Sequence, residues 1–195
     1  MRLNQYTKTQ QKDYDGSYGV LFLDIDGVIC TNRAYVGSGQ DQLKSILRTW
    51  DPISIQLVDR IAMDYNLSVV ISSTWRQHYD VPLILLTHGF KASFHKNDIT
   101  PNDARTRGCQ IYDWLSANRD VKNFVIFDDD TTGIEQTNLH PFQTVTSDTD
   151  GVLYSHYKKA QRILDAQLTG SLVYDHDDRW LDDSDKRDWY INKVW

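Results

Sequence analysis

The sequence predicts an α/β domain in which helices cover both faces of a parallel sheet. Short apolar runs that are typical of buried strands alternate with stretches whose apolar residues recur at helical spacing. The connections between them are short, which is typical of a three-layer α/β/α, Rossmann-like architecture. With 195 residues, 40% of them hydrophobic, the chain has the size and composition of one such domain.

The first half of the chain predicts two strands, a small insertion and a crossover helix. Residues 20–23 are apolar and stop at Asp24-Ile25-Asp26-Gly27, as a buried strand stops at a turn. Residues 31–51 are polar and predict a small cap insertion that could lean over a site. Pro52 opens a stretch of helical spacing, and residues 67–71 predict a second strand ending in two serines.

The second half predicts two further strands and two helices. Residues 81–86 are apolar without a clear period, so a helical turn and a strand both stay open there. Residues 101–117 predict a helix entered at a proline, and residues 124–127 predict a strand ending in three aspartates. A short strand over 142–146 and a helix over 154–168 complete the pattern.

Both ends of the chain fall outside this pattern. Residues 1–18 are interpreted as a polar N-terminal arm, which leaves residues 19–170 as the domain. Residues 171–195 form a tail that mixes aspartates with aromatic side chains. Because exposed tryptophans are unfavourable in water, we expect the tail to pack on the domain or on a second copy, so oligomerisation through it stays open.

Composition excludes several classes of function. The formal net charge of −6 argues against a protein that holds nucleic acid through a broad basic surface. No apolar stretch is long enough to span a membrane and the start of the chain is polar, so we expect a cytoplasmic protein without a membrane partner. The two cysteines are too few for a disulfide framework or a four-cysteine zinc site.

The main functional signal is the position of the polar residues at strand ends. Aspartate is so abundant in this chain that an Asp-x-Asp pair alone means little. Asp24 and Asp26, however, directly follow a buried strand, so both carboxylates can line one pocket. One carboxylate can attack phosphorus and form an aspartyl-phosphate, while the other protonates the leaving oxygen and later activates water. The pair therefore indicates phosphoryl transfer with Asp24 and Asp26 as catalytic residues.

Such a reaction needs positive charge, because an anion attacks an anion. Mg²⁺ prefers carboxylate oxygens, and an aspartate from another strand end would complete its coordination. The expected metal site draws on Asp24, Asp26, Asp128 and Asp129. The expected phosphate-binding residues are Ser72, Ser73, Arg76 and Arg107, with Arg105 as an alternative to Arg107 and a plain surface ion pair as an alternative for Arg76.

These segments resemble, in order, the motifs of the haloacid dehalogenase (HAD) superfamily of aspartate-nucleophile phosphatases. Residues 21–28 look like its first motif, residues 69–72 like its second, and residues 124–129 like its acidic fourth motif. Ser72-Ser73-Thr74-Trp75-Arg76 and the segment 100–115 are similar to a small phage and bacterial subgroup associated with RNA-repair proteins, in which Arg107 would take the basic position. The resemblance covers about residues 20 to 168.

The resemblance implies a magnesium-dependent phosphomonoesterase, a hydrolase in which Asp24 is the nucleophile and Asp26 the general acid and base. Residues 27–71 leave room for only a small cap, so we expect an open pocket that admits a nucleotide or a phosphorylated nucleic-acid end. Two alternatives remain: a phosphatase of a small sugar or metabolite phosphate, and a non-catalytic module that binds magnesium and phosphate to dock a partner.

Overall fold

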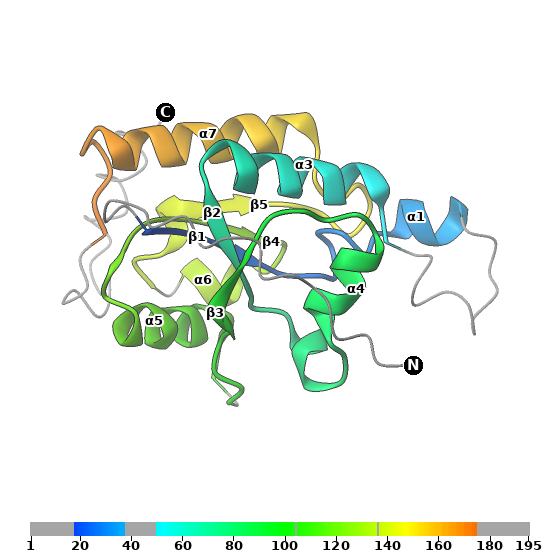
Figure 1. Cartoon of the computed structure of the whole chain (residues 1–195), viewed down its shortest axis with the longest axis horizontal. Helices are drawn as coiled ribbons and strands as arrows, with labels where there is room; N and C mark the ends of the chain where they lie inside the picture. The colour runs from blue at the N-terminus through cyan, green and yellow to red at the C-terminus, as the bar shows by residue number, and fades with distance from the viewer. Residues whose placement is uncertain (1–17, 38–49, 104, 136, 175–195) are drawn as a thin grey trace.

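The computed structural model describes residues 18–37, 50–103, 105–135 and 137–174, and these build a five-stranded, all-parallel sheet (Figure 1). The strand order is β3-β2-β1-β4-β5, so β1 lies in the centre between the second and fourth strands. The predicted α/β fold with a parallel, Rossmann-like sheet is thereby confirmed. The strands are β1 (Tyr18–Leu23), β2 (Leu67–Ile71), β3 (Phe94–Ile99), β4 (Val121–Asp128) and β5 (Gln143–Val145).

Helices cover the sheet from both sides. The helices α3 and α7 pack against one another and against β2, β4 and β5, above the sheet in Figure 1, whereas α5 and α6 contact one another below it. The helical segments are α1 (Asn32–Gly37), α3 (Pro52–Asp64), α4 (Val81–Thr87), α5 (Arg107–Ala117), α6 (Thr132–Glu135), α7 (Tyr154–Leu168) and the short 3-10 helices η1 (Thr74–Gln77) and η2 (His140–Phe142).

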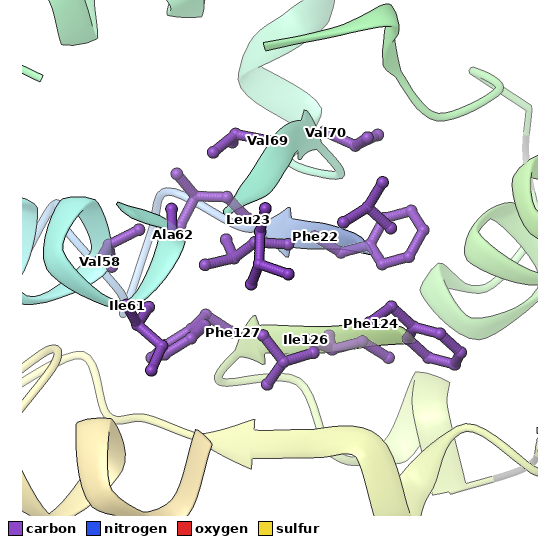
Figure 2. Packing of buried hydrophobic residues seen from close by; sticks show 14 of the residues in the cluster. Phe22, Leu23, Val58, Ile61, Ala62, Val69, Val70, Phe124, Ile126 and Phe127 are labelled. Atoms are coloured by element: carbon purple, nitrogen blue, oxygen red, sulfur yellow. The ribbon is translucent and has the colours of Figure 1, made fainter. Parts of the chain in front are cut away.

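Strand alternation divides the core between these two layers. Leu23 in β1 lies on the face of the sheet that α3 covers, toward Val58 and Ala62 (Figure 2). Phe22 points to the other face, where its ring meets Trp114 of α5 at a centroid distance of 5.2 Å. Successive side chains of a strand point to opposite faces, so the uninterrupted apolar run of β1 is what a strand covered on both faces requires.

The register of the sheet brings three polar residues to one edge. Leu23 pairs with Ile71 of β2 and with Phe127 of β4, so the next residues along the three strands follow at the same level. The Asp24 amide donates to the Phe127 carbonyl at 3.0 Å, and the Ser72 amide donates to the Leu23 carbonyl at 3.0 Å. Asp24, Ser72 and Asp128 therefore meet at the carboxyl edge, where ligands bind in sheets of this kind.

Three local predictions differ from the structure or were left open. The ambiguous segment 81–86 is helical and forms most of α4, which begins after the N-cap Asp80. β3 was not predicted because its sequence, Phe-His-Lys-Asn-Asp-Ile, is largely polar and it lies at the edge of the sheet. Helix α5 begins at 107 rather than 101, because the Thr106 side chain provides its N-cap.

The predicted insertion and the two ends are described only in part. Within the insertion, α1 is described and residues 38–49 lie outside the described part; the same holds for residues 1–17 of the arm. Of the tail, residues 171–174 are described, and the Tyr174 ring packs edge-on against Phe124 at 5.1 Å. The tail aromatics beyond them lie outside the described residues. None of the described helices is both long and apolar enough to cross a membrane.

Candidate active site

The loop after β1 carries the two predicted catalytic carboxylates. Asp24 is buried, whereas Asp26 is exposed, so the two side chains meet different surroundings. Gly27 follows with a φ of 69°, a left-handed conformation that side chains other than glycine's rarely adopt. A Cβ at Gly27 would also lie 2.2 Å from Asp129 Oδ2. The glycine therefore turns the loop and makes room for a carboxylate from another strand end.

Three carboxylates converge at this edge of the sheet. Asp24, Asp128 and Asp129 offer oxygen atoms that all lie within 4.8 Å of one another. Asp24 and Asp128 lie on the face that α5 covers, since each continues the alternation of Phe22 and Ile126 in its strand. The Asp128 carboxylate is fully buried and its Oδ1 accepts a hydrogen bond from the Asp130 amide at 2.9 Å.

Arg107, the first residue of α5, lies between two of these carboxylates. Its Nη2 is 3.4 Å from Asp24 Oδ1, and its Nε is 3.5 Å from Asp128 Oδ2. The start of α5 lies close to α6: a Cβ at Gly108 would be only 2.5 Å from the carbonyl oxygen of Gly133 in α6. This close approach places the guanidinium at the carboxylate cluster.

The electrostatics of the cluster favour a cation. Burial raises the pKa of the Asp128 carboxyl well above its ordinary value, and the charge of Asp24 raises it further, while Arg107 opposes the shift. Burial and Asp24 raise the pKa of Asp129 as well. Asp128 Oδ2 is buried and accepts no hydrogen bond from the described residues. Three converging carboxylates, only two of which contact a guanidinium in the described residues, fit a hard divalent cation such as Mg²⁺.

The two serines after β2 have different surroundings. Ser72 is buried, and its Oγ has no hydrogen-bond partner among the described residues. Arg107 Nη1 is likewise a buried donor without a described partner. The Ser73 hydroxyl instead caps η1 by accepting a hydrogen bond from the Trp75 amide. Ser72 and Arg107 therefore supply two free donors at the carboxyl edge, whereas Ser73 is occupied locally.

Arg76 lies nearby, but all three nitrogens of its guanidinium donate hydrogen bonds to other residues of the protein. Its Nε donates to the Thr100 carbonyl at 3.2 Å, and its Nη2 donates to the Pro101 carbonyl and to Gln110 Oε1, each at 2.9 Å. Its Nη1 donates to the carbonyls of both serines that follow β2. These bonds connect the β2–η1 loop to the β3–α5 loop and to α5. Arg76 thus joins the two loops, and its predicted roles, phosphate binding or a surface ion pair, stay predictions.

Arg105, the alternative to Arg107, lies away from the cluster. Its guanidinium pairs with Asp103 and Asp113 on the surface. Both carboxylates belong to the β3–α5 loop and α5 rather than to the strand ends. Of the two arginines, only Arg107 contacts the aspartates at the carboxyl ends of β1 and β4 in the described part of the chain.

The Asp26 carboxylate has a partner that sequence reasoning missed. Trp75 Nε1 donates to Asp26 Oδ2 at 2.8 Å, across 49 positions of the chain. Asp26 is not among the three residues that converge on one point, so its expected part in metal binding stays a prediction. The only sequence signal for Trp75 was its place in the Ser-Ser-x-Trp-Arg run, to which no role was assigned.

A family model described as "HAD domain in Swiss Army Knife RNA repair proteins" matches residues 20–151. These residues include both loops of the carboxylate cluster, Ser72, Arg76 and Arg107. The chain belongs to this family. No curated protein and no solved structure gave a significant match.

The family match agrees with the fold and with the site residues of this HAD domain. The predicted resemblance to the HAD superfamily and its RNA-repair-associated subgroup is confirmed by the match. Asp24, Asp128, Arg107 and Ser72 all lie at the carboxyl edge of the sheet, where parallel α/β sheets bind ligands. The HAD domain is therefore compatible with phosphatase chemistry in its fold and in its acidic cluster.

Proposed function

We propose that this HAD domain is a magnesium-dependent phosphomonoesterase that acts through an aspartyl-phosphate on Asp24. The observation that carries the proposal is the convergence of Asp24, Asp128 and Asp129 within 4.8 Å, with Arg107 bridging two of them. A structural ion-pair network would not need a third carboxylate beside the two that Arg107 contacts, because gathering like charges costs stability. A site that binds a cation and a phosphoryl group does need them.

In the proposed reaction the two aspartates have different roles. A carboxylate oxygen of Asp24 attacks phosphorus, and the bond between phosphorus and the leaving oxygen breaks as that oxygen takes a proton from Asp26. The alcohol leaves and the phosphoryl group stays on Asp24. The ionised Asp26 then removes a proton from water, which attacks phosphorus and releases inorganic phosphate, so that Asp24 and the proton on Asp26 are restored.

The other polar residues hold the phosphoryl group and the cation. Ser72 Oγ and Arg107 Nη1 are buried donors without described partners, and they suit the oxygens of a phosphoryl group. Asp24, Asp128 and Asp129 would hold Mg²⁺. When bound, the ion neutralises charge on the carboxylates and on the phosphoryl oxygens, which lets an anionic nucleophile approach an anionic substrate.

The substrate class we favour is the phosphorylated end of a nucleic acid, or a nucleotide. The matched family occurs in RNA-repair proteins, according to its description. Asp26 is the exposed carboxylate of the pair. Since Asp26 protonates the leaving oxygen, the leaving group lies on the solvent side of the site, which suits a leaving group as large as a polynucleotide.

Phosphate release from a defined panel tests the proposal. The panel contains an aryl phosphate, 3′- and 5′-mononucleotides, 3′- and 5′-phosphorylated oligonucleotides and sugar phosphates, each with Mg²⁺ or chelator. We expect Mg²⁺-dependent release that Asp24→Asn lowers about a thousandfold or more, while Asp120→Asn, an exposed control, leaves it unchanged.

The ranking of substrates separates the remaining possibilities. Preference for oligonucleotides supports a polynucleotide-end phosphatase, and preference for a sugar phosphate supports the metabolite alternative. Release from no member by folded protein that still binds Mg²⁺ would contradict the proposal and favour a docking module.

A further inference from the structure

We propose that Trp75 is a positioning residue that orients the Asp26 carboxyl group for proton transfer to the leaving oxygen. The proposal rests on the proposed function, because it assigns Trp75 a part in the same reaction. Its basis is the 2.8 Å hydrogen bond from Trp75 Nε1 to Asp26 Oδ2. The indole nitrogen is only a donor, so it holds one carboxyl oxygen and cannot take the proton itself.

Asp26 needs such a partner because it is exposed. A short carboxylate side chain in water samples several rotamers, and misplacing a catalytic group by about 1 Å can cost about a hundredfold in rate. With Oδ2 held by the indole, Oδ1 is the oxygen that carries the transferred proton. Trp75 comes from η1, after β2, so this bond also joins the loop after β1 to its neighbour.

The Trp75 ring is itself held in place by packing. Its ring centroid lies 5.7 Å from that of the buried Trp50, edge-on, and 5.0 Å from that of Tyr79. The Trp75 carbonyl also accepts hydrogen bonds from the amides of His78 and Tyr79, which fix the turn. A ring held by two aromatic neighbours loses little further conformational freedom when it binds Asp26, which is the requirement for a positioning residue.

Proton donation matters most when the leaving group is poor. An alkoxide such as the one released from a nucleotide needs the proton in the transition state, whereas a nitrophenolate leaves readily without it. We therefore expect Trp75→Phe to lower kcat/KM for an alkyl or nucleoside phosphate by roughly 10- to 100-fold. For p-nitrophenyl phosphate we expect a loss of less than about threefold.

Trp114 offers a matched control. Its indole Nε1 also donates a hydrogen bond, to the Asn97 carbonyl at 2.9 Å, but it lies on α5 and packs on Phe22 in the core. Trp114→Phe thus removes an indole hydrogen bond with no link to Asp26. It is expected to lower stability and to change kcat/KM for the two leaving groups by the same factor.

The experiment measures both substrates for Trp75→Phe, Trp114→Phe, Asp26→Asn and the Trp75→Phe/Asp26→Asn double variant, each checked for folding by its thermal melt. If Trp75→Phe does not fold, Trp75→Leu takes its place, since leucine keeps apolar bulk and has no hydrogen-bond donor. We expect the loss caused by Trp75→Phe to depend on the leaving group and to vanish in the Asp26→Asn background.

Two results separate failure of this inference from failure of the proposed function. The role of Trp75 alone would be overturned if the wild type is active and Trp75→Phe lowers kcat/KM for both substrates by the same factor. It would also be overturned if Trp75→Phe lowers kcat/KM as much in the Asp26→Asn background as in the wild type. A folded wild type that hydrolyses neither substrate would overturn the proposed function and this inference with it.

Discussion

Replacing Asp128 by Asn should make the metal-free protein more stable while weakening its response to Mg²⁺. Asp128 is fully buried, and its Oδ2 accepts no hydrogen bond from the described residues. Asn has nearly the same shape and keeps an oxygen for the Asp130 amide, which now donates to Asp128 Oδ1. Arg107 would keep its other contact, to Asp24, so the substitution does not leave the guanidinium without a carboxylate partner.

The size of the gain follows from the charge that is removed. Taking a carboxylate out of water costs several kcal/mol, and replacing poorly compensated buried ions by neutral groups often stabilises a protein by about 1–4 kcal/mol. Arg107 offsets part of that cost here, since it lies 3.5 Å from Asp128 Oδ2. We therefore expect Asp128→Asn to raise the free energy of unfolding by about 1–3 kcal/mol, or roughly 2–4 °C in Tm per kcal/mol for a chain of this size.

The stability of the metal-free wild type should also depend on pH. Burial and Asp24 raise the pKa of Asp128 in the folded state, so the folded protein binds more protons than the unfolded chain above the ordinary pKa of Asp. The free energy of unfolding therefore falls as the pH rises through the window between the ordinary pKa and the raised one. Asp128→Asn lacks this contribution, so the difference in the free energy of unfolding between the variant and the wild type should grow as the pH rises.

Thermal melts in chelator and in Mg²⁺, at several pH values, check this reasoning. Saturating Mg²⁺ at about a hundred times its Kd should stabilise the wild type by about 2.7 kcal/mol, and the variant by much less. The exposed Asp120→Asn serves as control and should leave both melts unchanged. If Asp128→Asn is less stable than the wild type in chelator at neutral pH, the argument that the buried Asp128 charge destabilises the metal-free protein is refuted.

Three further substitutions test the contacts around the cluster. Gly27→Ala should cost about 1–2 kcal/mol through its positive φ and should also weaken Mg²⁺ binding, measured by calorimetry, because its Cβ would displace Asp129. Arg76→Lys should lower the free energy of unfolding by about 2–4 kcal/mol in a denaturant titration, because lysine cannot replace the branched set of hydrogen bonds. Arg107→Ala should lower kcat/KM about 10²- to 10³-fold in phosphate-release assays and should leave Asp24 less compensated.

Matched variants separate specific from general effects. Gly89 also has a positive φ, 84°, but has open space where a Cβ would go, so Gly89→Ala should show the backbone cost and normal Mg²⁺ binding. Arg60 pairs with Asp64 on the surface, and Arg60→Lys should change stability by less than about 0.5 kcal/mol. Arg105→Ala should leave activity intact, since Arg105 pairs only with surface aspartates in the described chain. The pairs are Gly27 with Gly89, Arg76 with Arg60, and Arg107 with Arg105. If the two substitutions of a pair had equal effects, the effect could not be assigned to the contact that only the first residue makes.

Local sequence was sufficient wherever a pattern depends on neighbouring residues. The apolar run before Asp24 and the one before Asp128 predict buried strands, because strands covered on both faces have no polar alternation. Parallel strands end at the same edge, so the aspartates after them could be expected to meet. The edge strand β3 escaped detection for the same reason, since its exposed position permits a polar sequence.

By itself, the sequence determined the fold class, the ends of the three central strands and the aspartates and serine found there. Only the tertiary structure decided the partners of Arg76 and Trp75. Arg76 binds carbonyl oxygens, which every residue possesses, so no residue type marks its partners. Trp75 reaches Asp26 across two loops whose spacing depends on the sheet register. Short-range patterns depend on neighbouring residues and can be seen in the sequence, whereas contacts between loops depend on where the packed layers place those loops.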